Sequence, residues 1–191
     1  MRRVIVSMNV SIDGFMAGAN GELDWHFKSW DSDMAEALGE QLSFADTILL
    51  GANTYDAMAR YWPIAEGDLS LPRDDVAFAR MMNSHEKVVF SRTRPLPWNN
   101  ARFIKRSARR EVSLLKQQQG KDMIIFGSGA LVASLSEDKL IDRYILWVHP
   151  VILSRGRPLF KNVDQKLAMK LVRMRKFRSG VVTLYYDVIE A

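Results

Sequence analysis

The chain has 191 residues, 48% of them hydrophobic and 26% charged, a balance typical of one folded globular domain over residues 1–191. It has no cysteine, which excludes disulfides, thiol nucleophiles and cysteine metal sites and fits a cytoplasmic location. The net charge is +5, and no apolar run approaches the roughly 20 residues of a membrane span.

The positive charge is concentrated in the second half of the chain. Residues 1–100 hold 9 basic and 14 acidic residues, and residues 101–191 hold 18 basic and 8 acidic. A basic half can attract nucleic acid, an anionic membrane or a phosphorylated small molecule. Here the basic clusters at 102–110 and 166–178 are interleaved with apolar residues at strand or helix spacing, which favours solvated faces of ordinary elements. We therefore expect neither a nucleic-acid nor a membrane partner.

The first half of the chain predicts strands alternating with helices. Apolar β-rich runs predict strands, and Asp, Ser, Asn or Thr before an amphipathic run predicts a helix start. In chain order we expect a strand over 4–10, a long loop over 14–31, a helix from Asp31 or Ser32 to Phe44, a strand over 47–50, a helix over 55–61 capped by Asn53 or Thr54 and stopped by Pro63, irregular chain over 64–75, and a helix over 76–84.

The second half continues this alternation and then changes to strands alone. We expect strands over 87–90 and 102–105, a helix from the cap Ser107 to Gln119, a strand over 122–126, a helix ending at Leu135, a long β-rich run over 140–152, a loop at 155–158, and a closing hairpin of 167–177 and 181–189. Repeated strand–helix units predict an α/β fold with a mostly parallel sheet, to which the hairpin adds antiparallel strands at one edge.

Three strand ends carry residues suited to a ligand. In open α/β sheets, ligands bind beyond the carboxyl ends of the parallel strands. The three sets are Gly51, Asn53 and Thr54; Ser91, Arg92 and Thr93; and Gly127, Ser128, Gly129 and Ala130. Two of these ends lead directly into a helix, whose first N–H groups and positive dipole end suit a pyrophosphate. Each turn also has an ordinary reading as a tight strand-to-helix connection or a helix cap, and the Rossmann glycine fingerprint is absent.

Other residue types mark further candidates and exclusions. Asp13 follows the first strand and is either a proton donor or the anchor of an Asx-turn. A planar ligand would be lined by Trp25, Tyr55 and Trp62. The alternative is that these residues cover the core, as loop aromatics commonly do. The three histidines, His26, His85 and His149, show no metal-binding spacing, so we expect no metal. A GxSxG elbow and a Walker lysine motif are also missing.

The ordered set of motifs resembles the dihydrofolate-reductase-like family. It is most similar to the branch of the riboflavin-biosynthesis reductase C-terminal domain. The resemblance covers nearly the whole chain and rests on these segments: SMNVSIDGFMAG with GELDW, ADTILLGANTYDAM with YWP, KVVFSRT, DMIIFGSGALVASL, and LIDRYILWVHPVILSRGRPLF.

The resemblance implies a three-layer fold, NADPH as the cofactor and roles for several segments. It implies that the turns at 51–54 and 127–129 hold the dinucleotide phosphates, that 91–93 lies by the adenosine ribose, and that the loop over 13–25 covers the nicotinamide and the substrate. Dihydrofolate reductases of this kind have an arginine where this chain has Ala52, and the riboflavin-pathway reductases have a lysine where it has Phe15. Their carboxylate on the first helix has loose counterparts here in Asp31 and Asp33.

These observations predict a stand-alone NAD(P)H-dependent reductase. It would transfer a hydride to a C=N or C=O group of a small heterocyclic or sugar-amine substrate, similar to 5-amino-6-(5-phosphoribosylamino)uracil reductase in riboflavin biosynthesis. Asp13 or Asp33 would supply the proton, and Phe15 would contact the substrate together with the aromatic residues named above. The alternatives are a catalytically silent dinucleotide-binding protein and a dihydrofolate reductase. The β-rich final third, with apolar Ile145, Trp147, Val151, Leu184 and Tyr186, predicts a homodimer.

Overall fold

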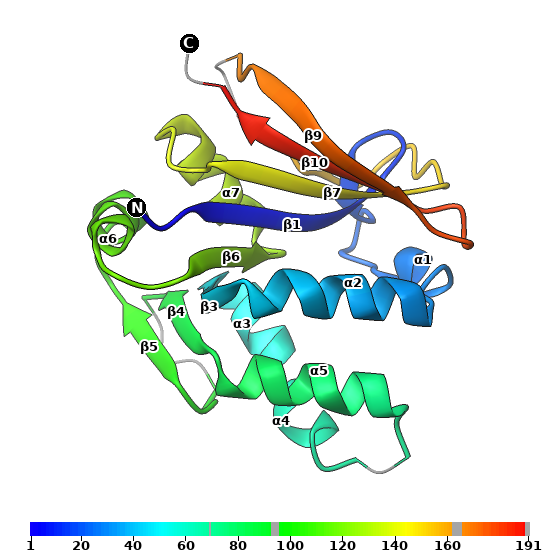
Figure 1. The fold of residues 1–191 in the computed structure, drawn as a ribbon, viewed down its shortest axis with the longest axis horizontal. Helices are drawn as coiled ribbons and strands as arrows, with labels where there is room; N and C mark the ends of the chain where they lie inside the picture. The colour runs from blue at the N-terminus through cyan, green and yellow to red at the C-terminus, as the bar shows by residue number, and fades with distance from the viewer. Residues whose placement is uncertain (69, 93–95, 162–165, 190–191) are drawn as a thin grey trace.

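A computed structural model describes residues 1–68, 70–92, 96–161 and 166–189 (Figure 1). In chain order the elements are β1 (Val4–Ser11), β2 (Phe15–Ala17), α1 (Asp24–Phe27), α2 (Ser32–Ser43), β3 (Ala45–Gly51), α3 (Ala52–Ala59), α4 (Trp62–Ala65), α5 (Arg73–Ser84), β4 (Glu86–Phe90), β5 (Ala101–Ile104), α6 (Ala108–Gln117), β6 (Asp122–Phe126), α7 (Gly129–Glu137), β7 (Arg143–His149), β8 (Arg157–Pro158), β9 (Met169–Lys176) and β10 (Val182–Val188).

The main sheet has eight strands in the order β5-β4-β3-β6-β1-β7-β10-β9. The first six strands in this order are parallel, whereas β10 runs antiparallel to β7 and β9 antiparallel to β10. This is the mostly parallel sheet with a terminal antiparallel hairpin that the sequence predicts. The hairpin adds to the sheet beside β7 and leaves β9 as an edge strand.

Helices pack on both faces of the sheet and make three layers. On one face, α6 and α7 contribute Val112, Leu115 and Leu131 to a core with the strand residues Val6 and Ile125. On the other face the helical residues come from α2, α3 and α5, and they pack in two clusters. Leu42, Tyr55 and Met82 pack on β3, β4 and β6, while Met34 and Ala37 pack on β1, β7 and β10. Burial of these apolar faces holds the layers together.

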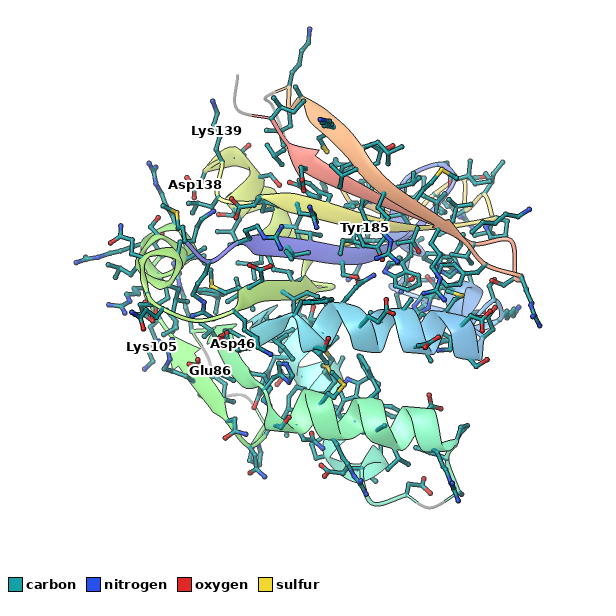
Figure 2. All side chains as sticks on the ribbon, viewed as in Figure 1. Asp46, Glu86, Lys105, Asp138, Lys139 and Tyr185 are labelled. Atoms are coloured by element: carbon teal, nitrogen blue, oxygen red, sulfur yellow. The ribbon has the colours of Figure 1, made fainter. Side chains whose placement is uncertain are left out.

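Hydrogen bonds and ion pairs close the amino-terminal edge of the sheet, where Figure 2 labels Asp46 and Glu86. Arg2 is buried and its guanidinium binds Asp46 and the Thr47 hydroxyl. Arg102 on β5 pairs with Glu86 at 3.0 Å. These contacts occupy the charged side chains at the amino-terminal edge with structural roles. We therefore look for a ligand site at the opposite, carboxyl-terminal edge.

Several local predictions need correction. The loop over 14–31 contains the short strand β2 and the helical turn α1, because β2 pairs with β8 inside the predicted loop at 155–158. The region over 64–75 contains the second half of α4 and the start of α5, and Pro63 lies in the first turn of α4, where a missing N–H costs nothing. The helix expected over 55–61 starts at Ala52 with Gly51 at its N-cap position, so neither Asn53 nor Thr54 is the cap.

Two caps can be compared directly with their predictions. Asp31 precedes α2 and its carboxylate accepts a hydrogen bond from the Met34 backbone N–H at 2.9 Å, which confirms it as the cap. Ser107 occupies the N-cap position of α6 but makes no capping hydrogen bond with its side chain.

Candidate functional site

The candidate site is the carboxyl-terminal edge of the parallel strands. Since β4, β3, β6, β1 and β7 are successive neighbours and run in the same direction, their carboxyl ends form one continuous row. The three polar strand ends predicted from the sequence belong to β4, β3 and β6, which are adjacent. The fold therefore brings these three segments together, as the prediction requires.

Direct hydrogen bonds join the turns after β3 and β6. The Ser128 hydroxyl accepts from the Gly51 N–H at 2.9 Å, and the Ser128 N–H donates to the Thr54 hydroxyl at 3.0 Å. Thr54, predicted as a possible helix cap, thus links two turns instead. Gly127 and Ser128 both have left-handed backbone conformations, with φ of 64° and 60°. The two turns are therefore joined into one unit at this edge of the sheet.

Both turns lead into helices whose first N–H groups lie at this edge. Helix α3 begins at Ala52 and α7 begins at Gly129. The first N–H groups of a helix have no intrahelical acceptor and form its positive end. Because the two turns are hydrogen-bonded to each other, two such positive helix ends lie side by side. A Cβ atom at Gly129 would overlap the Met16 side chain, which shows how closely β2 covers this turn. This donor set fits the negative charge of a dinucleotide pyrophosphate.

The third strand end is described only in part. Ser91 is buried and its backbone N–H donates to the Ile104 carbonyl at 3.2 Å, whereas Arg92 is exposed. Thr93 lies outside the described residues. Arg92 therefore follows β4, the strand next to β3, and its side chain is exposed.

Asp13 holds two loops together. Its carboxylate accepts hydrogen bonds from the Ser11 hydroxyl at 2.6 Å and from the backbone N–H groups of Leu153 and Ser154 at 3.1 and 2.8 Å. These bonds, the one from Ser11 foremost, lower the pKa of Asp13 below its usual value. An ionised carboxylate with three donors anchors the loop after β7 to the turn after β1.

Asp33 and Phe15 occupy different surroundings. Asp33 is exposed in the first turn of α2. Phe15 is half-buried in β2, and its backbone N–H donates to the Ser11 hydroxyl at 3.0 Å. Phe15 therefore lies at the carboxyl end of β1, and Asp33 is open to water.

The aromatic residues predicted to wall a ligand do not form one group. Tyr55 is fully buried, donates its hydroxyl hydrogen to the Leu96 carbonyl and packs on Trp98 and Phe103. Trp62, in α4, packs on Phe78 of α5, well away from α1 in Figure 1. The prediction that Tyr55 lines a planar ligand is therefore wrong in this structure. Tyr55 belongs to the core, because its position in α3 directs its ring toward β5. Only Trp25, in α1, lies near the carboxyl ends of β1 and β7.

The sequence prediction missed a pair of buried histidines below Trp25. His149 ends β7 and is fully buried, and His26 in α1 is 8% exposed. Their ring centroids lie 5.8 Å apart, and the Trp25 ring packs edge-on against both. Burial lowers the pKa of each histidine to about 4, and for His149 the neighbouring His26 adds to the effect. Spacing along the chain could not reveal this pair, because 122 residues separate its members.

This pair predicts a loss of stability in mild acid. In the folded protein both pKa values are about 4, whereas an unfolded histidine titrates near 6.5. Between these values the unfolded chain binds more protons, so the free energy of unfolding decreases as the pH falls below about 6.5. Urea unfolding at pH 7 and pH 5 measures the loss, and a His26→Phe variant should lose less. An equal loss in that variant would contradict the assignment.

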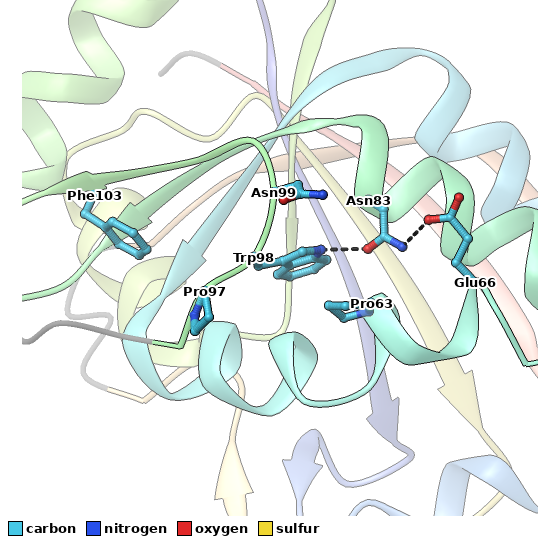
Figure 3. Close-up of a pocket in the computed structure, with 7 residues that line it drawn as sticks. All are labelled: Pro63, Glu66, Asn83, Pro97, Trp98, Asn99 and Phe103. Carbon is cyan, nitrogen blue, oxygen red and sulfur yellow. Dashed lines mark hydrogen bonds between the residues drawn. The ribbon is translucent and has the colours of Figure 1, made fainter.

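A cavity of about 320 Å³ lies elsewhere, between α4, α5 and the segment before β5 (Figure 3). The Trp98 indole N–H donates to Asn83 at 2.6 Å, and the Asn83 amide donates to Glu66 at 2.5 Å. These three polar groups are therefore already paired, and the cavity lies near the start of β5 rather than at the carboxyl ends of the strands. It does not belong to the candidate site.

Comparison with known proteins places the chain in a family. The family described as the RibD C-terminal domain matches residues 2–183. The chain belongs to the RibD C-terminal domain family. It is 36% identical over 185 residues to YyaP, an uncharacterized protein of Bacillus subtilis (strain 168), and the match covers 97% of this chain and 94% of YyaP. A second B. subtilis protein, the uncharacterized YwjB, is 25% identical over 187 residues and is matched over 96% of this chain and 97% of its own.

Solved structures confirm the RibD-type, dihydrofolate-reductase-like fold. A provisionally named riboflavin biosynthesis protein from Shewanella sp. PV-4 superimposes with a TM-score of 0.77 at 19% identity, covering 98% of this chain and 99% of that protein. The Thermotoga maritima deaminase/5-amino-6-(5-phosphoribosylamino)uracil reductase has a TM-score of 0.66 at 15% identity, covering 98% of this chain and 57% of that protein. These likenesses show the fold that the sequence resemblance implies.

Over the described residues, every helix is too short or too polar to cross a bilayer. Within the same part of the chain, no three His, Cys, Asp or Glu side chains are grouped so that they could hold a metal ion.

Proposed function

We propose that the protein is an NAD(P)H-dependent reductase that transfers a hydride to a C=N or C=O group of a small heterocyclic or sugar-amine substrate. The observation that carries this proposal is the paired unit of the turns after β3 and β6, with two helix starts side by side. Membership of the RibD C-terminal domain family supports it, since one structural relative is named as a uracil-derivative reductase.

The chain's own residues would bind and position both reactants. The N–H groups at the starts of α3 and α7 would hold the dinucleotide phosphates, with NADPH as the expected cofactor. When bound, that cofactor supplies the hydride. Phe15, Trp25 and the end of β1 would cover the reacting groups and exclude water, so that catalysis consists mainly of orientation.

The proton required by the reduction has two candidate sources among the carboxylates. The three hydrogen bonds that Asp13 accepts, together with its lowered pKa, favour an ionised anchor over a proton donor. We therefore assign Asp13 the positioning of the loop after β7. Asp33, exposed at the start of α2, would deliver a proton through water.

The direct test measures binding and turnover separately. Calorimetry should detect NADPH binding, and absorbance should show NADPH oxidation with at least one member of a panel of pterins, flavin precursors and small carbonyl compounds. Binding without oxidation of NADPH by any of these would favour a catalytically silent dinucleotide-binding protein. Absence of binding would refute the proposal.

Arg92 provides a prediction about cofactor choice. Its exposed guanidinium follows β4, and a guanidinium can bind the 2′-phosphate of NADPH bidentately, whereas NADH has only a hydroxyl there. We expect Arg92→Ala to weaken NADPH binding about tenfold, roughly 1.4 kcal/mol, and NADH binding far less. Arg60→Ala, at the far end of α3, is the matched control. Equal losses for both cofactors would show that Arg92 does not recognise the phosphate.

A further inference from the structure

The buried polar side-chain groups of the described residues are nearly all satisfied, and the exceptions are two residues on one face of the sheet and one in the turn α1. The buried side-chain atoms without a hydrogen-bond partner are His26 Nδ1, His149 Nδ1 and Thr183 Oγ1. His149 follows Trp147 by two residues in β7, and Thr183 of β10 lies opposite Trp147, so their side chains share the face covered by α2. Leaving a buried polar atom without a hydrogen bond lowers the stability of the folded protein. Unpaired atoms in one region therefore point to a function for that region.

Polar groups farther along the same strands are fully paired. The Trp147 indole donates to the Ser7 hydroxyl at 3.0 Å, and that hydroxyl donates to Gln41 at 2.7 Å. The Gln41 amide in turn donates to the hydroxyl of Tyr185, which is labelled in Figure 2, at 3.1 Å. The fold therefore satisfies its buried polar atoms on this face up to the strand ends, and the unpaired atoms begin where the site begins.

The hydrogen bond between Asn9 and His149 fixes what His149 can bind. His149 Nε2 lies 2.9 Å from Asn9 Oδ1, and an amide oxygen only accepts, so Nε2 carries the proton. The lone pair is then on Nδ1. With its pKa lowered to about 4 the ring stays neutral at physiological pH, so Nδ1 is an acceptor that calls for an N–H or O–H donor.

The surroundings of His149 favour a flat partner. Trp25 packs edge-on at 5.3 Å from the His149 ring, and Phe27 lies 4.2 Å from His26. Trp147, two residues before His149 in β7, packs on Trp30, with their ring centroids 5.9 Å apart. The short turn α1 carries Trp25 and His26 and places both rings against His149, so a ligand at Nδ1 would be bordered by aromatic rings.

We propose that His149 Nδ1, oriented by Asn9, binds an N–H donor on the substrate, and that His26 and Thr183 line the same subsite. The substrate is then a flat heterocycle that carries a ring N–H or an amino group, rather than a simple aldehyde or ketone. This inference rests on the proposed function for placing a substrate at the ends of β1 and β7. His149 is a substrate-binding residue and Asn9 a positioning residue.

The test uses nitrogen NMR of the histidines in the intact protein, with and without NADPH. The probes are 2-aminopyrimidine, which is neutral and has an N–H donor, and 2-methylpyrimidine, which has the same shape without the donor. The amino compound should shift the His149 Nδ1 resonance and the methyl compound should not. His85 is the internal reference, because both of its ring nitrogens already lie within 3.1 Å of backbone carbonyls.

Two results would overturn the inference. One is no response of His149 to 2-aminopyrimidine, the result expected if ordered water alone satisfies these atoms. The other is an equal response to both compounds, the result expected if binding depends on shape and not on the N–H donor. An Asn9→Leu variant tests the positioning role, and we expect its affinity for 2-aminopyrimidine to fall at least about fivefold, or roughly 1 kcal/mol. Unchanged affinity would refute that role. Calorimetry of NADPH on the same samples reports the cofactor site independently, so failure of this inference and failure of the proposed function are distinguishable.

Discussion

Replacing Gly129 by valine is expected to weaken NADPH binding at least about tenfold, or roughly 1.4 kcal/mol. Gly129 is the first residue of α7, and a Cβ atom there would overlap the Met16 side chain. The valine would push Met16 into the space above the turn and screen the N–H groups that would hold the pyrophosphate. Calorimetric titration of NADPH into the folded variant measures the effect.

Gly129 is a better position than Gly127 for this experiment. Gly127 has a φ of 64°, and a Cβ there would lie 2.9 Å from Thr54 Cγ2, so a side chain would strain the backbone and threaten folding. Gly39 in α2 has open space around it, and Gly39→Val is the matched control for a valine in a helix. A Gly129→Val protein that melts like this control yet binds NADPH with unchanged affinity would refute the site.

The sequence was sufficient to predict the layers and most elements of the fold. Buried strands such as β3 and β6 are short apolar runs with clear turns after them, so their pattern predicts a parallel sheet. The errors concern short elements that depend on partners distant in sequence. β2 and β8 exist because Phe15 and Ala17 pair with Pro158 and Arg157. No local pattern encodes such pairing.

The candidate site was predictable only where it follows strand ends. Topology alone places Gly51 and Gly127 side by side, and the sequence predicts the topology. Tyr55 illustrates the limit, since its orientation depends on packing against Trp98, which is 43 residues away. The buried pair of His26 and His149 was invisible for the same reason. Their pKa values depend on burial, which composition does not reveal.

We propose that a dimer, as the sequence predicts, forms through a smaller surface than the predicted residues suggest. Ile145 and Trp147 are 3% and 1% exposed and pack in the core with α2, so they are not available to a partner. Val151, Leu184 and Tyr186 are half-buried. The edge strand β9 supplies further apolar surface, because Leu171, Val172 and Met174 are 45%, 43% and 61% exposed. Figure 1 shows β9 and β10 extending beyond the helices.

We expect light scattering to give twice the chain mass of 21.8 kDa, because an uncovered edge strand with apolar side chains favours pairing with a second copy. A two-fold interface of this kind should bury on the order of 1,600 Å² in total. Introducing charge with Leu171→Glu and Met174→Glu together should leave a folded monomer. Phe44→Glu is the matched control, since Phe44 is 70% exposed at the end of α2, next to β3 and far from β9 in the sheet order. A mass that stays at 21.8 kDa for the unaltered chain as its concentration rises would refute the dimer.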